Sequence, residues 1–89
     1  MYTIYILQSS ISGRYYIGHT DEMSRRLTEH NLGMAKYTRR EKPWKLMYVE
    51  NYATRSAAMK REMEIKRKKS RKYIERLIEV RERPDTTKS

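Results

Sequence analysis

Apolar and polar residues alternate in two short segments near the start of the chain. Residues 3–7 and 14–19 are rich in β-branched and aromatic side chains, and the turn-forming residues 8–13 separate them. This pattern predicts a β-hairpin. If Gln8 faces Gly13 across a four-residue loop, Tyr5 stands opposite Tyr16, within the roughly 5 Å of a cross-strand pair. The two tyrosines are therefore expected to meet in space.

A helical repeat of apolar residues follows the hairpin. Thr20 or Asp21 can cap its first turn, because either side chain can accept from the free amides there. At about 100° per residue, His30 lies on the apolar face, Arg26 flanks that face, and Arg25 points away. Arg26 and His30 are four residues apart, so we expect them to be neighbours on the helix surface.

Two basic stretches of the chain combine cations with an aromatic residue. The first is a loop over residues 34–43, which contains Tyr37 and follows the glycine that ends the helix, and the second covers residues 66–72, directly before Tyr73. Cations beside an aromatic ring suit contact with backbone phosphates and occasional base stacking. The candidate nucleic-acid contacts are Lys36, Tyr37, Arg39, Arg40 and Lys66.

The rest of the chain predicts one more strand and two helices. Residues 44–52 are apolar on both faces, which suits a buried or central strand. Thr54 can cap the helix that follows, Ser70 can cap the last helix, and Pro84 marks its end. The predicted inward stripe of the first of these helices consists of Ala58, Met59, Met63 and Ile65. Glu62 projects into that stripe, whereas Glu64 lies on the far side.

The elements follow one another as strand, strand, helix, strand, helix, helix. A three-stranded antiparallel sheet covered by helices accounts for this order, so the predicted fold class is α+β. We expect residues 1–83 to form one domain and residues 84–89 a frayed tail. A chain of 89 residues buries roughly 60% of the surface that its unfolded form exposes, so its stability is expected to be modest.

Charge narrows the choice of partner. Lys and Arg number 21 against 11 Asp and Glu, and the resulting net charge of +10 makes a polyanion, nucleic acid above all, the expected partner. The absence of cysteine excludes disulfides and thiolate metal sites. No apolar stretch approaches the roughly 18 residues of a membrane span, so a cytoplasmic location without membrane contact is expected.

Five short motifs, in this order and spacing, resemble the GIY-YIG nuclease superfamily. They occupy residues 3–7 (TIYIL), 16–20 (YIGHT), 25–31 (RRLTEHN), 33–39 (GMAKYTR) and 61–66 (REMEIK). The resemblance is greatest to small stand-alone bacterial members of the UPF0213 kind, which are related to the nuclease half of the Slx-type structure-specific endonucleases. Thr3 stands where the family name has glycine. A β-branched residue suits a strand better than glycine does, so no loss of chemistry is expected.

The resemblance also implies a role for each candidate site residue. Tyr5 and Tyr16 would sit near the attacking water, Arg26 would contact the scissile phosphate, and His30 would assist proton movement. Glu62 would hold a single divalent metal, Mg²⁺ or Mn²⁺, which agrees with the preference of hard cations for oxygen ligands. Which of the two tyrosines is the general base stays open.

Taken without the resemblance, the same residues have structural interpretations. Glu62 can pair with Arg26 or a nearby lysine, because a carboxylate in an apolar stripe seldom lacks a partner. The two tyrosines can simply pack across the hairpin, and His30 can be a hydrogen-bonded core residue. His19 has no companion at metal-ligand spacing, so we do not expect it to take part.

We therefore predict a metal-dependent endonuclease acting on DNA, which could be branched or single-stranded. One active site makes one cut, so we expect a monomer or weak dimer and leave open a protein partner for targeting. The first alternative is a non-catalytic nucleic-acid-binding module or adaptor with the same fold. The second, which charge alone permits, is an RNA- or ribosome-associated basic protein.

Overall fold

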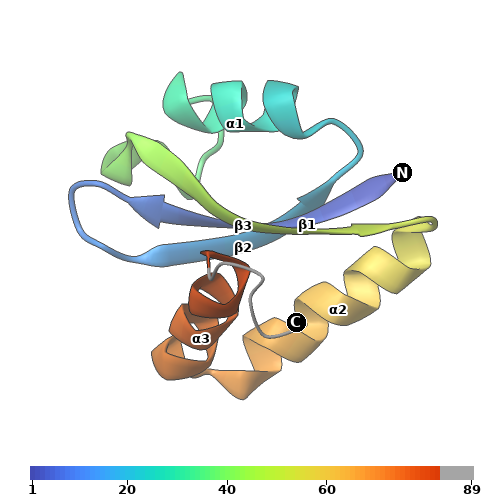
Figure 1. Ribbon diagram of the computed structural model, residues 1–89. Coiled ribbons are helices and arrows are strands. Elements are labelled where there is room, and N and C mark those ends of the chain that lie inside the picture. The colour runs from blue at the N-terminus through green and yellow to red at the C-terminus, as the bar shows by residue number, and fades with distance from the viewer. Residues whose placement is uncertain (83–89) are drawn as a thin grey trace.

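The computed structural model describes residues 1–82, which build one three-stranded sheet flanked by helices (Figure 1). The elements are β1 (Tyr2–Ser9), β2 (Tyr15–Thr20), α1 (Met23–Asn31), a short 3₁₀ helix (Arg39–Glu41), β3 (Trp44–Tyr52), α2 (Arg55–Lys68) and α3 (Arg71–Glu82). The predicted α+β class and the order β-β-α-β-α-α are confirmed. The expected stop at Pro84 and the tail over residues 84–89 lie outside the described residues. Within the described part, no helix has the length and apolar character needed to cross a bilayer.

The strands are antiparallel and lie in the order β2-β1-β3. Our prediction of a buried or central third strand was wrong, because β1 is central, β3 is an edge strand, and Trp44 is the one buried residue of β3. Helices lie on both faces of the sheet, with α1 on one face and α2 and α3 on the other (Figure 1). β3 is apolar on both faces because helices pack on both faces of the sheet. This pattern does not distinguish an edge strand from a central one.

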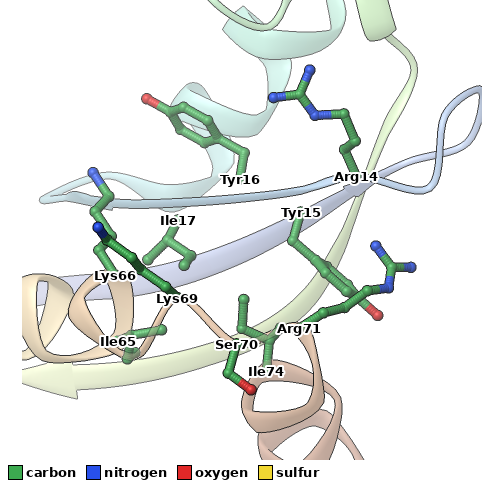
Figure 2. Close-up of a pocket in the computed structure, with 10 residues that line it drawn as sticks. All are labelled: Arg14, Tyr15, Tyr16, Ile17, Ile65, Lys66, Lys69, Ser70, Arg71 and Ile74. Carbon is green, nitrogen blue, oxygen red and sulfur yellow. The ribbon is translucent and has the colours of Figure 1, made fainter.

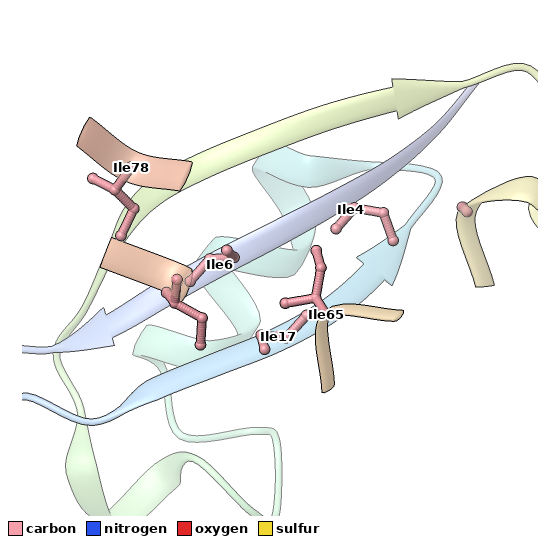
Figure 3. Packing of buried hydrophobic residues seen from close by; sticks show 7 residues of the cluster. Ile4, Ile6, Ile17, Ile65 and Ile78 are labelled. Carbon is pink, nitrogen blue, oxygen red and sulfur yellow. The ribbon is translucent and has the colours of Figure 1, made fainter. Parts of the chain in front are cut away.

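Successive side chains of β1 enter two different cores, because neighbours in a strand point to opposite faces. Ile4 and Ile6 are fully buried among the isoleucines of β2, α2 and α3 (Figure 3). Tyr5 and Leu7 are buried on the other face, in a cluster with Trp44 against which α1 packs. The sheet therefore presents Tyr5 to α1, which places this tyrosine in the functional site.

The hairpin has a different register from the one predicted. Tyr5 pairs with Gly18, and Leu7 pairs with Tyr16. The four-residue loop begins one residue later than expected, because the Ser9 amide donates to the Arg14 carbonyl and the Ser9 hydroxyl accepts from two loop amides. The shift is an even number of residues, so Tyr16 stays on the face of Tyr5. Their ring centroids lie 6.3 Å apart on a diagonal.

The helix caps were predicted correctly for α2 and α3 but not for α1. The hydroxyls of Thr54 and Ser70 accept from amides in the first turns of α2 and α3. At α1 the cap is Glu22, whose carboxylate accepts from the Ser24 amide. Thr20 instead accepts from the Glu22 amide, so its hydroxyl is used in the turn that leads into the helix.

The apolar stripe of α2 is narrower than predicted. Ala58 and Ile65 are buried, but Met59 and Met63 are 46% and 56% exposed, so their inclusion in the stripe was wrong. A helix that contacts a sheet along one line buries positions three, four and seven residues apart. Glu62, four residues after Ala58 and three before Ile65, occupies such a position and is only partly exposed.

Gly18 offers a test of the hairpin geometry. A Cβ atom added there would lie 2.5 Å from the Tyr5 hydroxyl oxygen. Tyr5 is 1% exposed and its ring cannot move freely, so we expect Gly18→Ala to lower the free energy of unfolding by about 1–3 kcal/mol in urea titrations. Adding Tyr5→Phe removes the nearest atom, so the double variant is expected to lose less than the sum of the single losses. Strictly additive losses would argue against the contact.

Candidate active site

Four of the predicted catalytic side chains come together between the sheet and α1. Strands β1 and β2 supply Tyr5 and Tyr16, and α1 supplies Arg26 and His30. The Tyr5 hydroxyl lies 3.1 Å from Nε2 of His30, and Nε of Arg26 donates to the same hydroxyl over 3.4 Å. The rings of Tyr16 and His30 meet edge to face, with their centroids 5.2 Å apart. The site thus joins two strands and a helix.

Hydrogen bonds hold both ring nitrogens of His30. Nδ1 lies 2.7 Å from the Thr38 hydroxyl, and Nε2 lies 3.1 Å from the Tyr5 hydroxyl. These distances fit either tautomer of the neutral ring. When the Thr38 hydroxyl donates to the Ala35 carbonyl, 3.5 Å away, Nδ1 carries the hydrogen and Nε2 is an acceptor facing Tyr5. In that tautomer the imidazole is oriented to receive a proton from Tyr5.

The environment keeps His30 neutral. The imidazole is completely buried, and this burial, followed by the charge of Arg26, lowers its pKa from 6.5 to about 4. At neutral pH the ring is therefore a free proton acceptor and adds no positive charge to the site. Burial likewise raises the pKa of Tyr5 above its usual value, and the hydrogen bond and charge of Arg26 offset only part of that effect.

Protein stability is expected to depend on pH through His30. The unfolded chain binds a proton near pH 6.5, whereas the folded protein does not bind it until about pH 4. As the pH is lowered from about 6.5 to about 4, the unfolded chain takes up this proton and the folded protein does not. The free energy of unfolding should therefore decrease over this range, by at most about 1.4 kcal/mol per pH unit. Urea titrations across this range measure the slope. In His30→Gln the slope should be flatter, and an unchanged slope would contradict the assignment.

Glu62 approaches the site from the opposite side of the sheet. It lies on α2, its side chain is 16% exposed, and its two oxygens lie 2.6 Å from Nδ1 of His19 and 2.6 Å from Nζ of Lys66. Burial alone would raise the pKa of this carboxyl, but the hydrogen bonds from Lys66 and His19 lower it below its usual value. The negative charge of Glu62 also contributes to the raised pKa of Tyr5, so the two residues are within electrostatic reach.

Part of the predicted pairing of Glu62 is seen and part is not. The carboxylate pairs with a lysine, as its structural interpretation anticipated, but not with Arg26, whose carboxylate partner is Glu29 at 3.0 Å. His19, which we did not expect to take part in the chemistry, lies against Glu62, with its Nδ1 2.6 Å from a carboxylate oxygen. The only signal in the sequence was the place of His19 directly after Gly18, since the contact joins residues 43 positions apart.

A divalent metal fits the donor at Glu62. No group of three or more His, Cys, Asp or Glu side chains suited to a metal occurs within residues 1–82. Mg²⁺ nevertheless binds through one or two carboxylates and keeps several waters. A carboxylate has about four lone-pair positions, and His19 and Lys66 use two of those on Glu62. His19 would orient the carboxylate, as the outer partners of metal ligands do.

The predicted nucleic-acid contacts lie on the surface around this site. Lys36, Arg39 and Arg40 are exposed, and Tyr37 is 84% exposed. The loop that carries them is attached to the hairpin through Glu41, whose carboxylate accepts from Ser12 and Arg14. Lys66 is also exposed, but it is engaged with Glu62. These positions allow phosphate contact without rearrangement of the core.

The whole set of motifs has a counterpart in known proteins. Residues 1–74 match the model of the GIY-YIG catalytic domain. The chain belongs to the GIY-YIG family.

Relatives of similar length support this assignment to the GIY-YIG family. A UPF0213 protein of Streptococcus pneumoniae is 44% identical over 81 residues, which cover 90% of this chain and 81% of the relative. A UPF0213 protein of Halobacterium salinarum is 43% identical over 67 residues, which cover 74% and 86% of the two chains. The solution NMR structure of a UPF0213 protein from Bacillus halodurans superimposes with a TM-score of 0.59 at 34% identity, covering 94% of this chain and 89% of that one.

The structure explains two residues of the GIY-YIG motifs in this chain. Gly18 leaves the space that the Tyr5 hydroxyl occupies, so the glycine of the second motif serves the tyrosine of the first. Thr3, at the glycine position of the first motif, lies in β1, and its hydroxyl donates to the Asn51 side chain over 2.8 Å. Asn51 belongs to β3, so Thr3 makes its hydrogen bond apart from those that join Tyr5 to His30 and Arg26.

Proposed function

We propose that this GIY-YIG domain is a metal-dependent endonuclease that hydrolyses phosphodiester bonds in DNA. The observation that carries the proposal is the hydrogen-bonded chain from Arg26 through Tyr5 to His30, with the ionised Glu62 within electrostatic reach. A phosphodiesterase needs a cation for the phosphate, an acceptor for the proton of water and a carboxylate for a metal. Arg26 supplies the cation, Tyr5 and His30 supply the acceptor, and Glu62, within electrostatic reach of Tyr5, supplies the carboxylate.

The proposed reaction assigns each group a step. The oxygen of a water forms a bond to phosphorus, and the phosphorus bond to the leaving sugar oxygen breaks. Tyr5 takes the proton of the water as its own hydroxyl proton passes to Nε2 of His30. Arg26 donates to the non-bridging oxygens as their charge grows, and the leaving alkoxide takes a proton from solvent. A divalent ion bound at Glu62 would stabilise negative charge on the phosphate and the leaving oxygen.

Tyr16 has a different environment from Tyr5, which matters for the choice of base. It is half-buried, and within the described residues its hydroxyl has no hydrogen-bond partner. In our proposal Tyr16 orients the attacking water or the phosphate, while Tyr5 carries the proton to His30. This division rests on the fixed position of the Tyr5 hydroxyl between a donor and an acceptor.

A non-catalytic nucleic-acid-binding module is the second candidate function. The observation in its favour is that Glu62 already has two partners, Lys66 and His19, at 2.6 Å each. A carboxylate satisfied in this way needs no metal for its burial. The net charge of +10 would then serve binding alone.

Cleavage of end-labelled DNA distinguishes the two candidates. Purified protein is incubated with single-stranded, duplex and branched DNA in Mg²⁺, in Mn²⁺ or in chelator. The nuclease proposal expects product only when metal is present, and it expects one cut for each binding event because one site serves each chain. Binding of all three substrates without any product would favour the second candidate.

A further inference from the structure

A groove of about 400 Å³ lies beside the candidate active site, between β2 and the junction of α2 with α3 (Figure 2). Its apolar residues are Ile17, Ile65 and Ile74, one from each of these elements. Around them stand Tyr15 and three cationic side chains, and no described carboxylate lines the groove. The three cations are Lys66, Lys69 and Arg71, whereas the side chain of Arg14 projects to the other side of the strand (Figure 2). The groove therefore combines an apolar interior with a purely cationic rim.

The groove shares one lining residue, Tyr16, with the proposed catalytic set and is lined by Lys66, the partner of Glu62. The ring of Tyr16 contacts those of Tyr5 and His30. Figure 2 shows Tyr16 and Ile17 projecting to opposite sides of β2, with Lys66 and Lys69 alongside the strand. The groove lies on the α2–α3 side of β2 and Arg26 on the α1 side, so a DNA strand that reaches both would pass over β2, which is an edge strand (Figure 1).

Lys69 is the cation most free to bind a ligand. Within residues 1–82 its ammonium group forms no ion pair, whereas Lys66 pairs with Glu62 and Arg71 with Glu75. Its backbone also has a left-handed conformation, with φ at 48°. Glycine is the usual residue at such a helix end, and a residue with a Cβ is disfavoured there. A lysine at this position sacrifices some stability and gains a cation at the rim.

The other side of the groove suits a base. The Arg71 guanidinium lies over the Tyr15 ring, 4.6 Å from its centroid. Nucleobases stack on aromatic rings and on guanidinium planes, and this mode tolerates any base. The amino end of α3 adds backbone amides at Ser70 and Arg71 that favour an anion nearby. Phosphate and base would therefore contact neighbouring parts of the same groove.

We propose that this groove binds one nucleotide of the DNA strand next to the phosphate that is cut, with its phosphate between Lys66 and Lys69 and its base on the Tyr15–Arg71 pair. The position next to the cut rests on the proposed nuclease function, but the binding does not. The volume falls in the range of roughly 300–1,000 Å³ typical of small-ligand sites.

The test is the binding of fluorescein-labelled pentathymidylate in chelator, where no metal-dependent cut can occur. Lys69→Gly removes the cation and relieves the left-handed strain, so the thermal midpoint should rise by a few degrees. Its dissociation constant should nevertheless increase on the order of tenfold. The plot of log affinity against log salt should flatten by about 0.7, the contribution of one phosphate contact in a single strand.

Lys60→Ala is the matched control. Lys60 is an exposed residue of α2 that does not line the groove, and its loss changes the net charge equally. We expect its affinity to stay within about twofold of wild type and its salt slope to be unchanged. A pentamer of abasic deoxyribose phosphates should bind wild type about tenfold more weakly than pentathymidylate, because the stacked base is missing.

Three results would overturn the proposal: wild-type affinity in Lys69→Gly, an equal loss in Lys60→Ala, or equal binding of the abasic pentamer. Failure of the nuclease function is a separate outcome. A protein that cuts no DNA but loses pentathymidylate binding in Lys69→Gly supports the groove and refutes the nuclease. A protein that cuts DNA but binds the pentamer independently of Lys69 refutes the groove and supports the nuclease.

Discussion

Glu62→Gln is expected to abolish metal-dependent DNA cleavage, with a loss of about 10²-fold or more in the single-turnover rate. The amide keeps the shape of the side chain and can still hydrogen-bond, but it lacks the negative charge that a divalent cation requires. Folding and DNA affinity should be nearly unchanged, which circular dichroism and binding in chelator would show. The expected defect is therefore confined to the step that needs metal.

Glu64→Gln provides the control for this variant. Glu64 lies two residues further along α2, its side chain is 60% exposed, and it pairs with Arg61. An exposed ion pair of this kind contributes little to stability, so cleavage should remain close to wild type. Equal loss in the two variants, or cleavage that persists in chelator, would contradict the role of Glu62 as metal ligand.

Arg26→Ala is expected to lower the cleavage rate far more than the affinity for DNA, by on the order of 10²-fold. Arg26 donates to Tyr5 and pairs with Glu29, so its guanidinium is fixed beside the proton path. An interaction that strengthens as charge develops on the phosphate appears in the rate and not in binding. Single-turnover kinetics at saturating protein separate the two quantities.

Arg25→Ala is the comparison, since it removes the same charge from the neighbouring position of α1. Arg25 points away from the sheet, where it pairs with Asp21 and Glu29. Its loss should weaken DNA binding slightly and leave the single-turnover rate unchanged. Indistinguishable rates for the two variants would refute the role given to Arg26.

Local periodicity was sufficient to predict the order of the elements and most of the candidate site. Arg26 and His30 are neighbours because residues four apart share a helix face, which the sequence reveals directly. Tyr5 and Tyr16 meet even though the predicted register was wrong, because a shift of two residues preserves the face. These features depend on spacing alone, so they tolerate errors in detail.

Features that depend on packing between distant segments could not be predicted in this way. The edge position of β3 follows from which strand β1 pairs with on each side. The contact of His19 with Glu62 depends on how closely α2 approaches the edge of β2. Thr38, which contacts His30, belongs to a loop for which the sequence predicts only a basic surface. Neither a helical nor a strand period encodes these approaches.

Cleavage in water enriched with ¹⁸O tests the proposed hydrolysis most directly. Wild-type protein and Glu62→Gln are each incubated with single-stranded DNA and Mn²⁺ for a single turnover. The masses of the products are then measured by mass spectrometry. Attack by one solvent water should leave one ¹⁸O atom on the terminal phosphate of the wild-type product, and Glu62→Gln should give almost no product. A wild-type product without ¹⁸O, or equal yields from the two proteins, would contradict hydrolysis at this site.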